Sequence, residues 1–195
     1  ELILEAGGFS GQTLAEDQDL TMAILRKGNR VDYAHRAVRL TEAPEALRPL
    51  LRQRFRWSYG TLQCAWKHRG ALLRPRNGLF GFVGLPNVWI FQLLFPFLSP
   101  IADLLFLWSV VTVYIMEVMH GPEFAMQTLQ QVVLFYTAFL AIDWLAAVIA
   151  LWMEPDEERW LSSLVLLQRF VYRQVMYLVV VKAGMTAIRG SGLGW

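Results

Sequence analysis

The C-terminal part of the chain, from residue 79 onward, is a long series of mainly apolar positions. Residues 79–119 contain only two charged side chains, Asp103 and Glu117. About 40 helical residues would extend about 60 Å, which is twice the hydrocarbon thickness of a bilayer. The stretch therefore predicts two crossings, over residues 79–98 and 101–119, or one crossing with a re-entrant or interfacial piece. The expected break lies at the helix-disfavouring residues Pro96, Ser99 and Pro100.

Two further apolar segments follow, over residues 126–153 and 160–187. The polar sequences "HGPEF" and "EPDEER" separate the last three segments from one another. With four crossings, Lys182 and Arg189 would lie on the same side of the membrane as the basic N-terminal part of the chain. The acidic sequence "EPDEE" would lie on the opposite side. Three crossings would place those C-terminal cations on the opposite side. The positive-inside tendency therefore favours about four transmembrane helices.

The front part, residues 1–45, mixes apolar and polar positions in shorter patterns. "EAGGFSG" predicts a glycine-rich loop. Thr13 with Glu16 fits a capping box that opens a helix continuing to about Lys27, where a glycine follows and ends it. The alternation over residues 30–40 predicts a strand. We therefore expect soluble α/β structure in this part of the chain.

The region of residues 46–78 joins the two parts, and a basic amphipathic helix is predicted in it, from Glu45 to about Trp66. This region contains eight Lys/Arg and no Asp/Glu. A basic helix that also carries large apolar side chains is typical of a helix lying in the headgroup plane of a membrane. The apolar side chains recur at a helical period, at Leu47, Leu51, Phe55, Leu62 and Trp66.

The composition also indicates a membrane protein, because 55% of the 195 residues are hydrophobic and only 17% are charged. Residues 1–78 carry 13 Lys/Arg and 8 Asp/Glu, whereas residues 79–195 carry 5 and 8. This asymmetry predicts a cytoplasmic part that leads into a membrane part.

The single cysteine, Cys64, excludes an internal disulfide framework and a cysteine-based zinc site. The chain starts at Glu1 without an initiator methionine, so we expect it to be the C-terminal portion of a longer protein.

Acidic residues cluster at the predicted helix start, in "AEDQDL". Glu16, Asp17 and Asp19 follow the glycine-rich loop directly. One interpretation is that they complement the helix dipole, as acids at helix starts commonly do. The other is that they present a carboxylate as a general base. The spacing by itself leaves both interpretations open.

The basic helix presents a second group, Gln53, Arg56 and Trp57, whose spacing places them on one face. A guanidinium binds phosphate oxygens bidentately, and an indole offers a flat apolar surface with an N–H donor. Such a face suits a substrate that carries both phosphate and sugar. The alternative is an interfacial helix, with basic residues for anionic lipid and Trp at the headgroup level. We expect no nucleic-acid partner, because the apolar block starts about 20 residues later.

Charged residues inside apolar segments need partners or water, because each otherwise costs several kcal/mol. Arg169 and Arg173 are four residues apart and share a helix face. They predict ion pairs with Asp103 or Asp143, the lining of a hydrated polysaccharide path, or both.

The order of these motifs resembles that of the processive family 2 glycosyltransferases, such as cellulose, hyaluronan and chitin-oligosaccharide synthases. These enzymes have a "(T)ED" motif, then "Q(Q/R)xRW", then an interfacial helix and a transmembrane bundle. Glu16-Asp17 and the run Gln53-Arg54-Phe55-Arg56-Trp57 match the two motifs. "TEAPE" and the terminal "RGSGLGW" look like the bacterial poly-N-acetylglucosamine synthase branch. Ala15 replaces the threonine of many members, which leaves the carboxylates in place.

The resemblance implies that residues 1–45 are the end of a cytoplasmic GT-A domain of the α/β class. The interfacial helix region would follow over residues 46–78 and the transmembrane bundle over residues 79–195. The first 78 residues would then be cytoplasmic, in a multi-pass protein of the bacterial inner (plasma) membrane.

Roles for the motif residues follow from the same resemblance. Asp17 would be the general base that deprotonates the acceptor hydroxyl, with Glu16 in support and with inversion at the anomeric carbon. The remaining site residues, Gln53, Arg56 and Trp57, would hold the donor diphosphate and the acceptor sugar.

The resemblance implies Mg²⁺ or Mn²⁺, held by a D-x-D motif that we expect upstream, so we expect no metal site within these 195 residues and no activity from them alone. The expected donor is a UDP-sugar, with UDP-N-acetylglucosamine favoured, and the product is a β-linked exopolysaccharide pushed outward through the lipid bilayer. Accessory membrane subunits are compatible with this interpretation. Two alternatives remain open: a non-processive family 2 enzyme acting on a lipid carrier, and a non-catalytic membrane scaffold or transport module.

Overall fold

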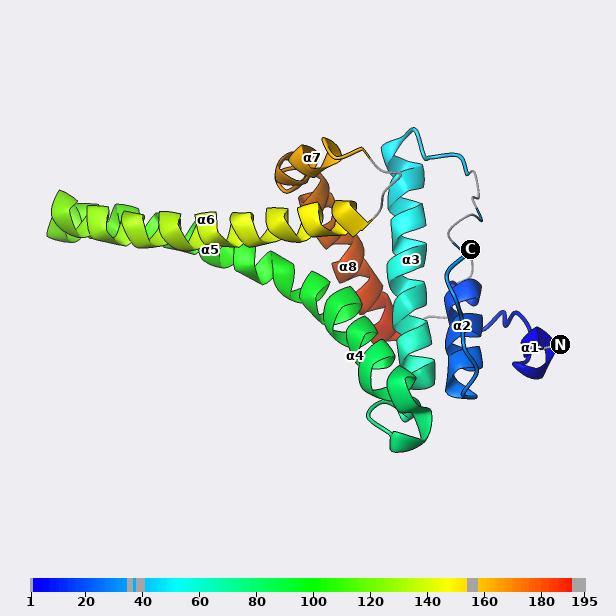
Figure 1. Ribbon diagram of the computed structural model, residues 1–195. Coiled ribbons are helices and arrows are strands. Elements are labelled where there is room, and N and C mark those ends of the chain that lie inside the picture. The colour runs from blue at the N-terminus through cyan, green and yellow to red at the C-terminus, as the bar shows by residue number, and fades with distance from the viewer. Residues whose placement is uncertain (1, 35–36, 38–40, 154–157, 191–195) are drawn as a thin grey trace. The chain divides into compact units, whose positions relative to one another are not determined.

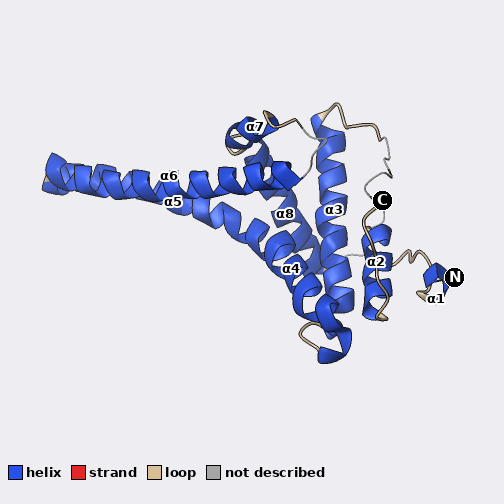
Figure 2. Ribbon diagram, in the orientation of Figure 1, coloured by secondary structure: helices blue, strands red, loops and turns tan. Residues whose placement is uncertain are grey.

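The computed structural model describes residues 2–34, 37, 41–153 and 158–190. The described residues form helices, turns and loops and contain no strand (Figure 2). They divide into two compact units. The first unit comprises the described residues up to Phe97 together with those from Met176 onward, and the second runs from Leu98 to Val175.

The first unit is a set of helices arranged around one long helix (Figure 1). The long helix is α3, Leu47–His68, and α2, Glu16–Arg26, lies beside it. Both helices begin and end within two residues of the positions that the sequence predicts. The other elements are α1 (Leu2–Glu5), the 3₁₀ turns η1 (Arg69–Ala71) and η2 (Pro75–Asn77), the π-helical turns η3 (Phe80–Gly84) and η4 (Val88–Leu94), and α4 (Leu85–Asn87).

Two different faces of α3 are packed. On one face, Phe55 and Tyr59 contact Val179 and Ala183 of α8, Tyr172–Arg189. On another face, α3 contributes Cys64 and Ala65 to a core that includes Met22 of α2 and residues of α4 and η4. The predicted apolar stripe is therefore confirmed only in part. Leu51, Phe55 and Leu62 are packed, whereas Leu47 and Trp66 are exposed.

Two sequence predictions in the first unit are wrong. Thr13 and Glu16 do not form a capping box, because α2 has Ala15 at its N-cap and no side-chain hydrogen bond caps it. The strand predicted over residues 30–40 is not formed at Arg30–Ala34 or Ala37, and the other residues of that stretch lie outside the described ones. A strand needs a hydrogen-bonded neighbour, and none of the described segments supplies one.

The second unit contains most of α5 (Phe95–His120), α6 (Pro122–Met153), α7 (Leu161–Gln168) and the start of α8. Two helical segments of the described residues are long and apolar enough to cross a membrane. They are Phe80–His120, with 41 residues, and Ala125–Met153, with 29 residues. The second of these confirms the apolar segment that the sequence places at residues 126–153.

The break predicted at Pro96, Ser99 and Pro100 is absent, because Phe80–His120 is one continuous helical segment. Pro96 directly follows a stretch in which α-helical and π-helical turns alternate, and such local adjustments satisfy backbone groups that a proline leaves free. Pro100 lies inside α5. The predicted break position instead coincides with the boundary between the two compact units, at Phe97 and Leu98. The segment predicted at residues 160–187 is likewise corrected, since it consists of α7 and α8 separated at Arg169–Val171.

A charge-balanced cluster joins the helices of the second unit. Arg169 is only 3% exposed, and its Nη2 donates a hydrogen bond of 2.7 Å to Asp103 Oδ1. Arg173 Nη2 lies 2.8 Å from Asp143 Oδ2, and Arg169 Nη1 lies 3.8 Å from the same oxygen. Arg169 Nε also donates to the hydroxyl of Tyr136. The predicted pairing of the two arginines with the two aspartates is therefore confirmed.

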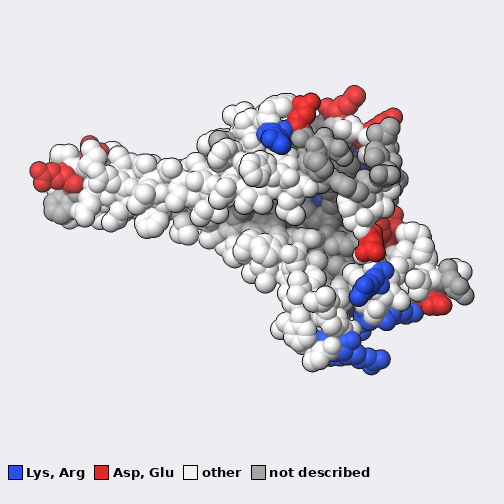
Figure 3. Space-filling view, in the orientation of Figure 1, with Lys and Arg blue, Asp and Glu red and all other residues white. Residues whose placement is uncertain are grey.

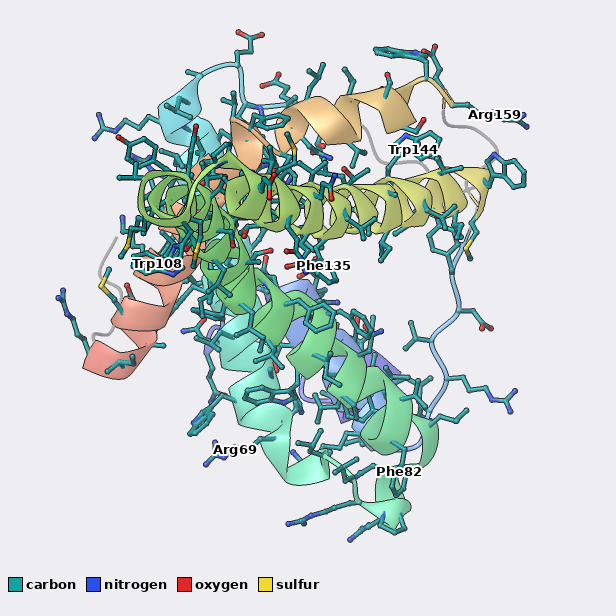
Figure 4. All side chains as sticks on the ribbon, turned by 90° about the vertical axis from the view of Figure 1, so that its left-hand side faces the viewer. Arg69, Phe82, Trp108, Phe135, Trp144 and Arg159 are labelled. Atoms are coloured by element: carbon teal, nitrogen blue, oxygen red, sulfur yellow. The ribbon has the colours of Figure 1, made fainter. Side chains whose placement is uncertain are left out.

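The outer surface of α5 and α6 is apolar. Large exposed side chains include Trp108 on α5 and Phe135 and Trp144 on α6 (Figure 4). At the ends of α5 and α6 that meet, the face in Figure 3 shows acidic residues and no Lys or Arg. Apolar patches of this extent are rare on monomeric soluble proteins and are expected on helices that face lipid.

Candidate functional site

The acid pair predicted from the sequence lies at the start of α2. Glu16 and Asp17 are the first two residues of the helix, and both side chains are exposed. Asp17 Oδ1 accepts a hydrogen bond of 2.8 Å from the backbone N–H of Gln18, the next residue of the same helix. The carboxylate of Asp17 is therefore oriented by its own helix turn and remains open to a substrate.

The start of α2 is docked closely on α3. A Cβ atom added at Gly60 would lie 2.8 Å from both the Cβ and the backbone N of Ala15, so only glycine fits there. Two hydrogen bonds of 2.9 Å join the same regions. The backbone N–H of Leu14 donates to Gln63 Oε1, and Thr61 Oγ1 donates to Gln18 Oε1. These contacts on both sides of the acid pair fix it against the middle of α3.

A buried ionic cluster lies farther along the same contact between α2 and α3. Asp19 Oδ2 is 2.7 Å from Lys67 Nζ, and Asp19 Oδ1 is 2.8 Å from His68 Nε2. Burial raises the pKa of the Asp19 carboxyl, but the hydrogen bonds and charges of Lys67 and His68 together lower it below its ordinary value. Asp19 is therefore an ionised acceptor at neutral pH. The sequence shows its carboxylate but not these partners.

Cys64 is fully buried in the same contact, and its thiol donates a hydrogen bond to the backbone carbonyl of Ala15. Burial raises the pKa of the Cys64 thiol to about 11, and the nearby charge of Asp19 adds to this effect. Cys64 is consequently neutral at physiological pH and is a packing residue rather than a nucleophile.

The motif residues of α3 divide between a pocket and an exposed surface. Gln53 and Arg56 line a pocket of about 540 Å³, together with residues of the preceding loop and of the first two turns of α3. Trp57 does not line this pocket. This residue is 52% exposed, and the guanidinium carbon of Arg54 lies 4.7 Å from the centroid of its ring. The remaining lining residues are Glu42, Ala43, Pro44, Arg48, Pro49 and Arg52.

Three guanidinium groups line the pocket, from Arg48, Arg52 and Arg56. Their spacing of four residues places them along one face of α3. None of the three forms an ion pair with another described residue. Unpaired guanidiniums in a pocket suit a phosphate-bearing ligand, and Gln53 adds an amide that can bond to hydroxyls. Arg48 and Arg52 are site candidates that the motif alone does not indicate, although their four-residue spacing is visible in the sequence.

Part of the α3 motif shares a helix face with the residues on which the start of α2 is docked. Gln53, Trp57, Gly60 and Cys64 recur at the spacing of a single helix face. The start of α2 covers the Gly60–Cys64 part of that face and leaves the Gln53–Trp57 part open. In the described structure no hydrogen bond or ion pair joins the acid pair to Gln53, Arg56 or Trp57.

The described residues contain no group of three His, Cys, Asp or Glu side chains that could hold a metal ion. Asp17-Gln18-Asp19 has the letters of a D-x-D motif, but Asp19 is directed at Lys67 and His68. These residues do not fit a metal site, and the metal expected from upstream residues stays a prediction.

Gly60 offers a test of the docking of α2 on α3. Alanine in a helix interior is normally more stable than glycine, by about 1 kcal/mol. At Gly60 we expect the opposite sign, because the added methyl group overlaps Ala15 and overpacking costs roughly 1–3 kcal/mol. Gly70→Ala is the matched control, since its Cβ would meet only Arg26 Nη2, at 3.9 Å. Thermal unfolding should show a lower Tm for Gly60→Ala alone; equal Tm values for the two variants would contradict the close docking.

Comparison with known proteins adds the chemical context. A family model described as "Glycosyl transferase family group 2" matches residues 1–186. A protein of Bradyrhizobium diazoefficiens named N-acetylglucosaminyltransferase is 38% identical over 68 residues, which cover 32% of this chain and 14% of that protein. No solved structure matches the chain.

Proposed function

This chain belongs to glycosyl transferase family group 2, and we propose that it polymerises sugar from a UDP-sugar into a β-linked exopolysaccharide and moves the polymer across a membrane. The observation that carries the proposal is the docking of the start of α2 on α3. It combines an open carboxylate, Asp17, with an arginine-lined pocket and an exposed indole. Those are the groups that a transfer from a sugar diphosphate to a sugar hydroxyl requires.

We assign the proton transfer to Asp17. Its carboxylate would accept the proton of the acceptor hydroxyl as that oxygen attacks the anomeric carbon of the donor. The bond from that carbon to the diphosphate breaks at the same time, UDP leaves, and the configuration inverts. Glu16, beside it at the start of α2, would support the charge of this site.

We assign substrate binding to α3. Arg56 would bind the diphosphate oxygens, with Arg48 and Arg52 adding positive potential along the same pocket. Gln53 would bond to a sugar hydroxyl, and Trp57 would offer its exposed ring to the apolar face of the acceptor sugar. A divalent cation held by upstream residues would neutralise the diphosphate when bound.

The favoured donor is UDP-N-acetylglucosamine. The relative from Bradyrhizobium is named N-acetylglucosaminyltransferase, and it is 38% identical in the matched region. That region is only 14% of the relative's length, so the donor identity is part of the proposal. The resemblance to the poly-N-acetylglucosamine synthase branch, in "TEAPE" and "RGSGLGW", supports the same donor.

The membrane part of the proposal rests on the long apolar helices. Phe80–His120 and Ala125–Met153 would lie in a bacterial inner (plasma) membrane together with α7 and α8, and about four crossings stay the predicted number. The first 78 residues would be cytoplasmic, where UDP-sugars are made available. The growing polysaccharide would leave through the membrane, with accessory subunits as partners where they exist.

A panel of nucleotide sugars tests the donor and the chemistry together. Purified full-length protein should release UDP fastest with UDP-N-acetylglucosamine, and it should release little with UDP-glucose, UDP-glucuronate or GDP-mannose. Faster release with another member of the panel would reassign the donor. Absence of release with every member would overturn the proposed transfer.

Arg56→Lys tests the assignment of the diphosphate. Lysine keeps the charge but cannot form the two parallel hydrogen bonds of a guanidinium. We expect the KM for the donor to rise roughly tenfold, which corresponds to the loss of about 1.4 kcal/mol of binding. Arg69→Lys is the control, because Arg69 is exposed outside the pocket and contacts Trp66 in the last turn of α3. Equal KM values for the two variants would remove Arg56 from the donor site.

A further inference from the structure

Asp17 and Asp19 are two residues apart on α2 but lie in opposite environments. Asp17 is exposed, whereas Asp19 is 2% exposed and in contact with α3. This difference follows from helix geometry, because two residues of an α-helix correspond to a rotation of about 200°. Asp17 can therefore face a substrate while Asp19 holds the helix in place.

The partners of Asp19 are adjacent residues near the end of α3. Lys67 Nζ donates to Asp19 Oδ2 at 2.7 Å, and His68 Nε2 bonds to Asp19 Oδ1 at 2.8 Å. The side chains of Asp19 and His68 are both nearly inaccessible to solvent. Each carboxylate oxygen thus has its own donor, so the position of α2 is fixed both along α3 and around it.

The helix α3 connects the cluster to the candidate site. Gly60, Cys64 and His68 are spaced by four residues and form one line along α3. Ala15, the N-cap of α2, contacts the first two, and Asp19 of α2 contacts the third. Trp57 lies one turn before Gly60 on the same helix. A displacement of α2 along this line would move Asp17 relative to Trp57 without altering either residue.

A purely apolar contact would hold the two helices together at a lower desolvation cost. Replacing a buried ionic group by well-packed apolar side chains is often neutral or stabilising. The apolar core beside the cluster, which includes Met22, Cys64 and Ala65, already supplies such packing. The ionic group adds specificity for one relative position of α2 and α3, because hydrogen bonds are directional and these are formed in that arrangement only.

We propose that Asp19, Lys67 and His68 are positioning residues that set the register of α2 on α3 and thereby place the Asp17 carboxylate against substrates bound at Gln53, Arg56 and Trp57. This inference rests on the proposed function for its effect on transfer. A misplacement of about 1 Å at a reacting group can cost about 100-fold in rate. Loss of the cluster therefore lowers kcat and leaves donor affinity, which depends on the α3 pocket, nearly unchanged.

The experiment uses purified full-length protein and two independent readouts. The first is kcat and KM for UDP release with UDP-N-acetylglucosamine. The second is the rate of alkylation of Cys64 by a maleimide at pH 7.5, followed by mass spectrometry of the peptide that contains it. Cys64 reports on the contact directly, because it is fully buried there and bonded to Ala15.

For Asp19→Ala we expect kcat to fall about 100-fold, the donor KM to stay within about twofold, and Cys64 alkylation to accelerate at least about tenfold. His68→Gln retains a hydrogen-bond donor and should keep much more of kcat than His68→Leu. Arg69→Met is the matched control for Lys67→Met, since both remove a cation near the end of α3 but only Lys67 contacts Asp19.

Several outcomes would overturn the inference. They are a wild-type kcat in Asp19→Ala, equal activity of His68→Gln and His68→Leu, or a lower kcat with unchanged Cys64 alkylation. A wild-type protein without transfer would overturn the proposed function instead. The alkylation rates would then decide the inference by themselves, with faster alkylation in Asp19→Ala supporting the cluster's role and an unchanged rate contradicting it.

Discussion

An Asp17→Asn variant of the full-length protein is expected to insert into the membrane normally and to lose sugar transfer by roughly 10³-fold. Asparagine keeps the size and the hydrogen-bond acceptor of the side chain but cannot take up the acceptor's proton. General base catalysis is typically worth about 10²–10⁴-fold, and this variant removes it alone. The measurement is UDP release together with the yield of polymer.

The structure gives Asp17 little role in stability. Its side chain is exposed, and its one described hydrogen bond is to the next residue of its own helix, which asparagine can also accept. A charge at a helix start contributes only about 0.3–1 kcal/mol, so the Tm should fall by no more than a few degrees. Asp32→Asn, another exposed acid, is the control. Near-normal synthesis by Asp17→Asn would exclude this residue as the base and favour the helix-dipole interpretation.

Arg169→Met is expected to prevent stable assembly of the second unit. Methionine fills a similar volume, but Asp103 then loses its hydrogen bond of 2.7 Å from Arg169, and Asp143 loses a second nearby cation. Removing one member of a buried ion pair typically costs about 3–5 kcal/mol. Because the Asp103 side chain is 18% exposed and keeps a hydrogen bond from Gln174, we expect a loss near the lower end of this range. The measurement is the Tm and the monodispersity of the detergent-solubilised protein.

The controls for Arg169 separate charge from packing. Arg159→Met removes an exposed cation of the same region and should leave the Tm unchanged. The double variant Arg169→Met with Asp103→Leu removes both charges and should recover part of the lost stability. A wild-type Tm for Arg169→Met, or no recovery in the double variant, would contradict the ionic account of this cluster.

The helices of the first unit could be predicted because their signals are local. Gly28 ends α2 with a positive φ of 86°, as the glycine after the predicted helix suggests. The helical period of its apolar residues predicts α3, and the scarcity of charged residues after position 78 predicts the long apolar helices. The pairing of Arg169 and Arg173 with aspartates could also be anticipated, because few acids are available in the apolar segments.

Features that depend on contacts distant in sequence could not be predicted. Proline lowers helix propensity locally, yet Phe80–His120 continues past Pro96, which follows a π-helical turn, and past Pro100, which lies inside α5. The strand pattern over residues 30–40 has no neighbouring strand among the described segments.

The candidate site shows the same division. Asp17, Gln53 and Trp57 are indicated by their motifs, but nothing local distinguishes Gly60 from an ordinary helical glycine. Its importance arises from Ala15, which is 45 residues away in the sequence and would lie 2.8 Å from an added methyl group. Asp19 likewise reads as one more acid at a helix start until its contacts with Lys67 and His68 are known.

The length of the product tests the central claim most directly. Full-length protein at low concentration should be given excess labelled UDP-N-acetylglucosamine and then an unlabelled chase, and its products should be separated by size at early times. A processive polymerase gives long labelled chains while most acceptor is still unused, and the chase extends the same chains. Products that carry one added sugar, or that lengthen together by single steps, would contradict the polymerising account and favour a transferase that acts once on each acceptor.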